Sequence, residues 1–91
     1  MTYFIKKEYF RKLTQIGYSH NKQLHAFVLD VDDKRYTIDD LTGEFKAYVE
    51  VAKETTIKLN GEDKILKACH LEILDDIKPY NIPVNWWDEV K

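Results

Sequence analysis

The chain has 91 residues, of which 44% are hydrophobic, 13% aromatic and 33% charged, and its net charge is −2. This length predicts one domain over residues 1–91, with a core at about 3–77 and a tail at 78–91. The composition excludes a disordered chain, the single Cys69 excludes an internal disulfide framework, and no apolar run reaches the roughly 18 residues of a membrane span. The N-terminal segment lacks the continuous apolar core of a signal peptide, so we expect an intracellular protein, cytoplasmic or nuclear, without a membrane partner.

Residues 3–17 fit two kinds of structure. Helical spacing is found at Tyr9, Phe10, Leu13 and Ile16. The residues before them, Tyr3, Phe4 and Ile5, could form a strand. The pattern favours a short strand followed by a short helix over about 8–16. Gly17 suits the exit of that helix because glycine tolerates positive φ there.

Alternating apolar residues predict strands at 24–31, 35–39 and 45–51. Polar turns separate them at 32–34 and 39–43, where aspartate, threonine and glycine are the residue types that turns select. The three strands therefore form a meander of two consecutive hairpins.

The second half of the chain contains one strong hairpin signal, Asn60-Gly61, because both residues accept positive φ. A dense run of β-branched residues before it predicts a strand at 55–59. Residues 65–74 fit a strand or a helix, and the preceding Asn-Gly favours the strand. Five strands joined by tight turns predict a mostly β (small α+β) fold, a five-stranded antiparallel barrel with a short N-terminal helix. Residues 78–91, interrupted by proline, predict an extended C-terminal tail.

The stretch from Tyr36 to Gly43 reads Y-T-I-D-D-L-T-G. It resembles the turn between the second and third strands of oligonucleotide-binding (OB) folds from the replication protein A middle subunit and its telomeric relatives. The resemblance continues weakly over residues 24–74, and it implies an OB-like barrel that binds single-stranded nucleic acid, alone or as an accessory subunit of a nucleoprotein complex. Two family features have no counterpart in this chain, namely the helix between the third and fourth strands and the C-terminal helix that assembles heterotrimers.

A basic and aromatic stretch near the N-terminus is the candidate nucleic-acid surface. Single-strand binders need cations along the phosphates and aromatic faces for the bases. We expect phosphate contacts from Lys6, Lys7, Arg11, Lys12 and Arg35. We expect bases to stack on Tyr9, Tyr36 and Tyr48. The alternative interpretation is an ordinary amphipathic element with buried aromatic side chains and solvated lysines.

Five aspartates cluster around the predicted hairpins: Asp30, Asp32, Asp33, Asp39 and Asp40. Turn chemistry explains them, and their spacing does not match a calcium-binding loop, so no metal is expected. The same residues could instead imitate phosphate in the basic groove of a partner protein, with Trp86 or Trp87 as an anchor. This alternative describes a protein–protein interaction module, such as an inhibitor encoded by a phage or mobile element.

Catalytic motifs are not found in the sequence. His20, His25 and His70 lack metal-ligand spacing, and Cys69 and His70 are neighbours that would point to opposite faces of a strand. Neither a phosphate-binding glycine loop nor a nucleophile elbow is present. We therefore expect a non-enzymatic binding module without a cofactor.

Overall fold

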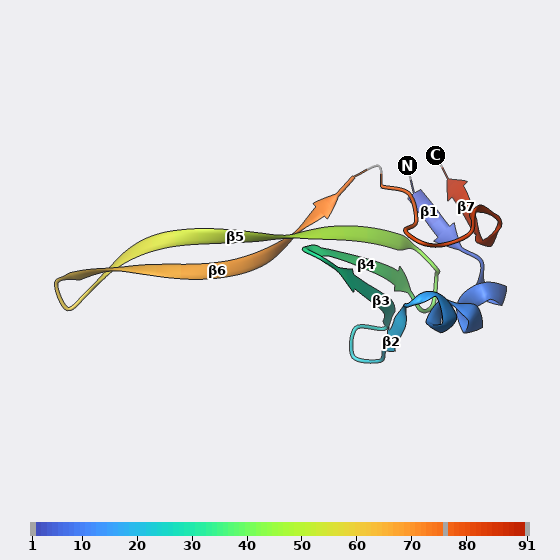
Figure 1. The fold of residues 1–91 in the computed structure, drawn as a ribbon, viewed down its shortest axis with the longest axis horizontal. Coiled ribbons are helices and arrows are strands. Elements are labelled where there is room, and N and C mark those ends of the chain that lie inside the picture. Colours follow the sequence, from blue (N-terminus) through green and yellow to red (C-terminus); the bar gives the residue numbers. More distant parts are fainter. Residues whose placement is uncertain (1, 76, 91) are drawn as a thin grey trace.

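The computed structural model describes residues 2–75 and 77–90 (Figure 1). Along the chain these residues form β1 (Thr2–Ile5), η1 (Lys7–Ile16), β2 (Ser19–Asn21), β3 (Ala26–Val31), β4 (Lys34–Asp39), β5 (Phe45–Leu59), β6 (Glu62–Leu74), η2 (Val84–Trp86) and β7 (Trp87–Val90). The η segments are 3-10 helices. The prediction of a mostly β chain with a short helix near residues 8–16 is confirmed.

Two antiparallel sheets make up the fold. The larger sheet has five strands in the order β2-β3-β4-β5-β6, and the smaller one pairs β1 with β7. Each strand of the larger sheet lies next to its neighbour in the sequence, so this sheet is a simple meander. Since β2 and β6 remain at its two edges, the sheet is not closed, and the predicted barrel is not confirmed.

The core lies where β1, η1, β4, β5 and the C-terminal segment meet. It consists mainly of aliphatic and aromatic side chains that are less than a tenth exposed: Tyr3, Ile5, Leu13, Tyr18, Tyr36, Ile38, Phe45, Ala47 and Ile82. The Tyr18 hydroxyl donates to the Tyr80 carbonyl oxygen at 2.7 Å. Burial is the main cause that raises the pKa of Tyr18.

The C-terminal segment folds back onto the body, unlike the extended tail that the sequence predicts. Ile82 is buried, and the side-chain amide of Asn81 donates to the Ile16 carbonyl at 2.8 Å. β7 then pairs with β1, from Ile5↔Trp87 to Thr2↔Val90. Both prolines lie before β7, so they remove no hydrogen-bond donor from that strand, and burial of apolar side chains favours the return.

The hairpin of β5 and β6 projects far beyond the rest of the sheet (Figure 1). β5 has 15 residues and β6 has 13, and they pair continuously from Ala47↔Leu74 to Leu59↔Glu62. β4 covers β5 only as far as Val49. Residues 50–71 therefore form a two-stranded projection, which we call the arm.

The tip of the arm is the Asn60-Gly61 turn, with φ angles of 54° and 81°. Positive φ at both residues is the geometry of a type I′ turn, as the sequence predicts. Residues 65–74 belong to a strand, which confirms the favoured alternative. The strands expected separately at 45–51 and 55–59 are one continuous strand.

Candidate functional site

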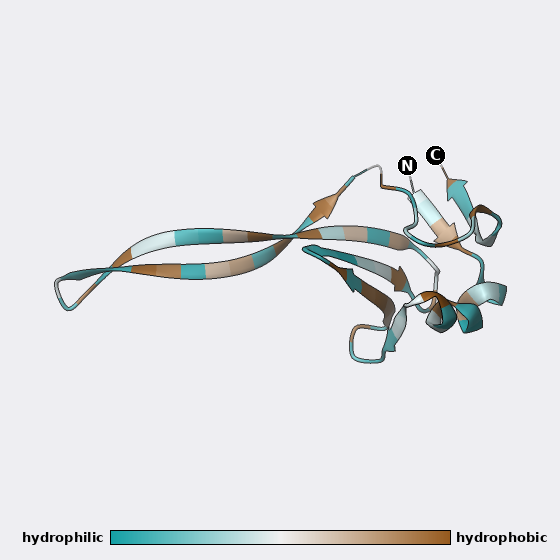
Figure 2. Cartoon of the chain, in the orientation of Figure 1, coloured by the Kyte–Doolittle hydropathy of each residue, from teal (hydrophilic) through white to brown (hydrophobic). Residues whose placement is uncertain are grey.

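Large aliphatic side chains are exposed along the arm. Ile65 is 65% exposed and Leu66 is 51% exposed, and Leu59 and Leu71 are also open to solvent. Figure 2 shows hydrophobic segments alternating with hydrophilic ones over the length of the projection. Apolar surface of this kind, outside any core, is typical of an interaction site.

Both faces of the arm carry apolar residues. Side chains alternate along a strand, so Ile65 and Leu66 project from opposite faces. Leu66 shares its face with the buried Ala47 near the base of the hairpin, whereas Ile65 shares its face with Leu71. Since neither face is covered, the arm has no core of its own.

The arm is electrically neutral. It contains four lysines and four acidic residues: Lys53, Lys58, Lys64, Lys67, Glu50, Glu54, Glu62 and Asp63. Lys67 and Glu54 lie 3.9 Å apart across the two strands. The mixture of signs distinguishes the arm from the cationic ribbons that follow a nucleic-acid backbone.

Both long edges of the arm are without a strand partner among the described residues. β6 is an edge strand over its full length, and β5 becomes one beyond Val49. Isolated two-stranded hairpins are marginally stable in water, and free strand edges readily add another strand. The arm thus combines free backbone groups with exposed apolar side chains.

The Y-T-I-D-D-L-T-G stretch forms the end of β4 and the turn into β5. One carboxylate oxygen of Asp39 accepts from the amides of Leu41 at 2.8 Å and Thr42 at 2.9 Å. Hydrogen bonds from Thr42 and Leu41 lower the pKa of Asp39. The Gly43 carbonyl accepts from the Ile5 amide at 2.7 Å. The motif therefore ties β1 to the larger sheet, which gives these residues a structural role.

Two other aspartates of the acidic set are engaged within the body. Asp30 accepts from the Arg35 guanidinium at 2.8 Å, and this bond raises the pKa of Arg35. Asp40 lies 2.9 Å from a ring nitrogen of His20. These carboxylates are paired with groups of their own chain.

The remaining two aspartates, Asp32 and Asp33, lie in the β3–β4 turn at the base of the arm. The Asp33 carbonyl accepts from the Glu50 amide at 2.7 Å. Both aspartates line a surface hollow of about 340 Å³ together with Cys69 and Leu71 of β6. The acidic turn is thus continuous with the arm.

The predicted nucleic-acid residues divide between two places. Four cations lie on η1 or just before it: Lys6, Lys7, Arg11 and Lys12. Here Tyr9 stacks on Trp86 with ring centroids 5.0 Å apart, and the Lys12 ammonium lies 5.6 Å from the Tyr9 centroid. This group of cations and half-buried rings is called the η1 patch.

The other three predicted residues lie in the larger sheet, away from η1. Tyr36 is 5% exposed and stacks on Tyr80 at 4.7 Å, so its ring belongs to the core. Arg35 and Tyr48 are cross-strand neighbours on β4 and β5. The structure does not bring these three side chains together with the η1 patch.

Both tryptophans pack against the N-terminal segment and are half-buried. Trp86 stacks on Tyr9, and Trp87 meets Tyr3 edge to face at 5.1 Å. The indole N–H of Trp87 is buried without a hydrogen-bond partner among the described residues. Both indoles therefore contribute to the attachment of the C-terminal segment.

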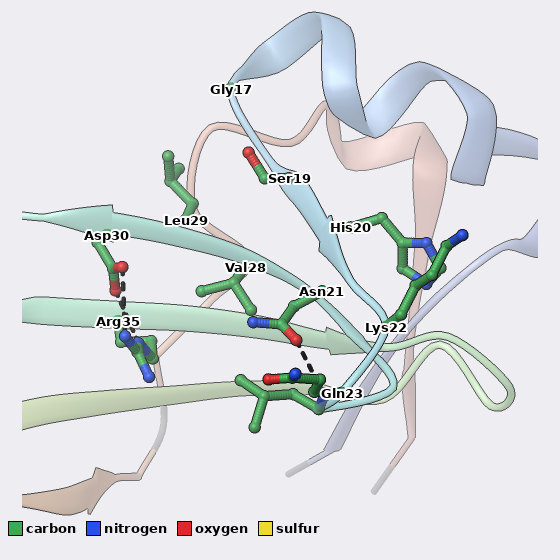
Figure 3. A pocket seen from close by; sticks show the side chains of 11 residues that line it. Gly17, Ser19, His20, Asn21, Lys22, Gln23, Val28, Leu29, Asp30 and Arg35 are labelled. Carbon is green, nitrogen blue, oxygen red and sulfur yellow. Dashed lines mark hydrogen bonds and ion pairs between the residues drawn. The ribbon is translucent and has the colours of Figure 1, made fainter.

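A second hollow, of about 660 Å³, surrounds the β2–β3 loop (Figure 3). Its polar side chains mainly serve the loop: the Asn21 carboxamide accepts from the Leu24 amide at 3.0 Å. His20 points away from the Asp30–Arg35 pair in this view. Within residues 2–75 and 77–90, no three His, Cys, Asp or Glu side chains are close enough to hold a metal ion.

Cys69 and His70 lie midway along β6, on opposite faces. His70 contacts Glu72 at 2.9 Å, whereas the exposed Cys69 thiol interacts with Glu50, which raises the pKa of Cys69. A raised thiol pKa disfavours the nucleophilic thiolate. The two side chains do not form a nucleophile–base pair.

Comparisons with protein-family models, with curated proteins and with solved structures find no match. In the part of the chain that the structure describes, no helix is long and apolar enough to cross a membrane. Candidate sites therefore rest on the geometry of this chain. Sequence reasoning anticipated the cations and Tyr9 of the η1 patch but missed the arm. The signal for the arm is the presence of apolar residues at both odd and even positions of the two strands that flank Asn60-Gly61.

Proposed function

We propose that this chain is a non-enzymatic protein–protein interaction module that binds through the arm. The observation that carries the proposal is a long hairpin with two free edges and exposed aliphatic side chains on both faces. A partner strand added to such an edge gains main-chain hydrogen bonds, and alternate side chains provide specificity. The acidic turn at Asp32 and Asp33 adds a charged contact at the base of the arm.

The charge of the arm supports a protein partner. Four lysines are interspersed with four acidic residues, so a nucleic-acid backbone would meet as many repulsive as attractive groups. A polypeptide with mixed charge can pair with both signs. The inhibitor expected from the acidic residues is one form of such a module, with the arm as its main contact.

Site-specific photo-crosslinking tests this proposal. A photoreactive amino acid replaces Leu66 on the arm or, as the control, Leu41 in the β4–β5 turn, which is 73% exposed. In cells that contain the chain naturally, we expect protein adducts from position 66 and few from position 41. The adduct is identified by mass spectrometry and its binding reconstituted with purified partner, which Leu66→Lys should weaken. Equal adducts at both positions, or adducts with nucleic acid, would contradict the proposal.

A second candidate function is single-stranded nucleic-acid binding at the η1 patch. The specific observation is the Tyr9–Trp86 stack beside Lys12 and three further cations. Aromatic faces flanked by cations are the components that single-strand binders use. The resemblance of residues 36–43 to OB folds also supports this candidate.

A fluorescence-anisotropy titration with single-stranded DNA and RNA at two salt concentrations tests the second candidate. Binding should weaken steeply with salt, since cations release counterions from phosphate. Substituting Lys6, Lys7, Arg11 and Lys12 by glutamate should abolish binding, whereas Lys58→Glu on the arm should have no effect. Undetectable binding at low salt excludes this function.

A further inference from the structure

We infer that the partner of the arm is a second copy of this chain, paired edge to edge through β6 about a twofold axis at Ala68. The inference rests on the proposed function and names the partner of the same surface. Twofold dimers are the commonest protein assemblies, and their interface is self-complementary. The sequence of β6 can therefore be examined for complementarity with itself.

The turn at the tip of the arm determines which backbone N–H and C=O groups of β6 are not bonded to β5. In a two-residue hairpin the residues that flank the turn, Leu59 and Glu62, form a hydrogen-bonded pair, and the pattern then alternates. The even-numbered residues of β6 thus bond to β5. Independent support comes from the Glu50 amide, which is bonded to Asp33 on the far side of β5, opposite Leu71.

The odd-numbered residues of β6 point their N–H and C=O groups outward. An antiparallel twofold pair on this edge must place odd residues opposite odd residues, which leaves a small set of registers. Each register is identified by the residue on the axis. The choice among them depends on the side chains that come to face each other.

The register with Ala68 on the axis is complementary at its central pairs on both faces, whereas at its two ends Glu62 and Asp63 face the aliphatic Leu74 and Ile73. Lys64 lies opposite Glu72 of the second copy, and by symmetry this attraction occurs twice. Ile65 lies opposite Leu71, also twice, while the two small Ala68 side chains meet at the centre. Cross-strand pairs of opposite charge and of large aliphatic residues are both stabilising.

Neighbouring registers are less favourable. With Lys67 on the axis, Lys67 meets its own copy and Glu62 meets Glu72, so every charged contact is repulsive. With Cys69 on the axis, the central attraction between Lys64 and Glu72 is lost, because Lys64 faces Leu74, Glu72 faces Leu66 and Lys67 faces Leu71. Like charges directly opposite each other destabilise a strand pair.

The edge of β5 is a poorer candidate. Its free part spans only residues 50–59, so a twofold pair on this edge is shorter. β6 offers 13 residues without interruption. Antiparallel pairing on β6 also places each body beside the tip of the other arm, so the two bodies lie at opposite ends of the dimer.

Charge exchange tests the register. In sedimentation equilibrium, the native chain should dimerise, and Lys64→Glu should raise the dissociation constant about tenfold or more because two attractions become repulsions. Glu72→Lys should have the same effect, and the double exchange Lys64→Glu with Glu72→Lys should restore the dimer. Lys58→Glu on β5 is the matched control and should leave dimerisation unchanged. Circular dichroism verifies that each variant is folded.

Disulfide trapping provides a second measurement, which detects the dimer directly and does not depend on weakening it. In the Cys69→Ser background, Ala68→Cys should cross-link to a covalent dimer under mild oxidation, since directly opposed residues have Cα atoms within disulfide range. Lys58→Cys in the same background is the control and should form no covalent dimer, although it still associates through β6. The native Cys69 faces Lys67 of the second copy and should cross-link poorly.

Three outcomes would overturn the inference: a native chain that is monomeric at all concentrations, a failure of the double exchange to restore the dimer, or preferential cross-linking through Cys69 or position 58. A monomeric chain whose position 66 still cross-links to another protein would leave the proposed function standing. A chain that is monomeric and also gives no protein adduct from position 66 would remove the arm as a binding surface.

Discussion

Gly43 occupies a position that a side chain cannot share. A Cβ atom there would lie 2.3 Å from the backbone oxygen of Ile5, and the residue has a φ of +82°. Gly61 has a similar φ of +81° but open space around it. We therefore expect Gly43→Ala to lower the free energy of unfolding by at least about 2 kcal/mol, and Gly61→Ala by only about 1 kcal/mol. Urea denaturation measures both values, and equal losses would contradict the close approach.

Asp39 makes the stability of the same turn dependent on pH. Its carboxylate accepts two backbone hydrogen bonds, and the pKa of Asp39 is lowered in the folded chain. The stabilisation is therefore fully present above the unfolded pKa of about 3.9 and is lost as the pH falls through the folded value. We expect Asp39→Asn to destabilise the chain at pH 7 and to lose this disadvantage near pH 2. Denaturation at several pH values measures the difference, and a constant difference would contradict this origin.

At the scale of the secondary-structure elements, the two edges of the arm differ in a way that hydrogen exchange can detect. In a β6-paired dimer the outward amides of β6 are protected, whereas those of β5 stay in water. Slow exchange is expected at the β6 amides of Ile65, Lys67, Cys69 and Leu71. Fast exchange is expected at the β5 amides of Ala52, Glu54 and Thr56. Dilution below the dissociation constant should remove the difference. Fast exchange at both edges at high concentration would contradict the pairing.

Local signals were sufficient for β3, β4 and the turns that follow β4 and β5. Asn60-Gly61 predicted the tip, and the alternation around Asp39 predicted the second hairpin, because both depend on neighbouring residues. The η1 patch was predictable for the same reason, since most of its members are close in sequence. Trp86, which completes it, is brought to Tyr9 only by the return of the C-terminal segment.

Properties that depend on distant residues could not be predicted. The sequence suggested a break near residues 52–54, but pairing with β6 keeps β5 extended through them. Tyr36 appeared available for stacking because a strand pattern does not show which face is covered, and Tyr80 from the C-terminal segment covers it. The pairing of β7 with β1 likewise joins the two ends of the chain, so no local pattern marks it.

The shape of the whole molecule favours an assembly over an isolated chain. Its dimensions are 59 × 27 × 21 Å and its radius of gyration is 17.1 Å. A compact chain of this length has a radius of gyration of about 12 Å. The arm therefore exposes backbone and side chains that contribute little to the core, and a chain this small has little stability to spare. Pairing the arms would bury surface that the monomer leaves in water.

The twofold pairing at Ala68 also determines the length of the assembly. Ala68 lies seven residues beyond Gly61, about 23 Å from the tip at a rise of about 3.3 Å per residue. About 36 Å of the 59 Å monomer then lies on the body side of the axis, so the dimer should be about 70 Å long. Small-angle X-ray scattering should show a doubled mass with only this modest increase in maximum dimension. Dimers joined tip to tip or body to body would approach twice the length of the monomer, and such a length would contradict the overlap of the arms.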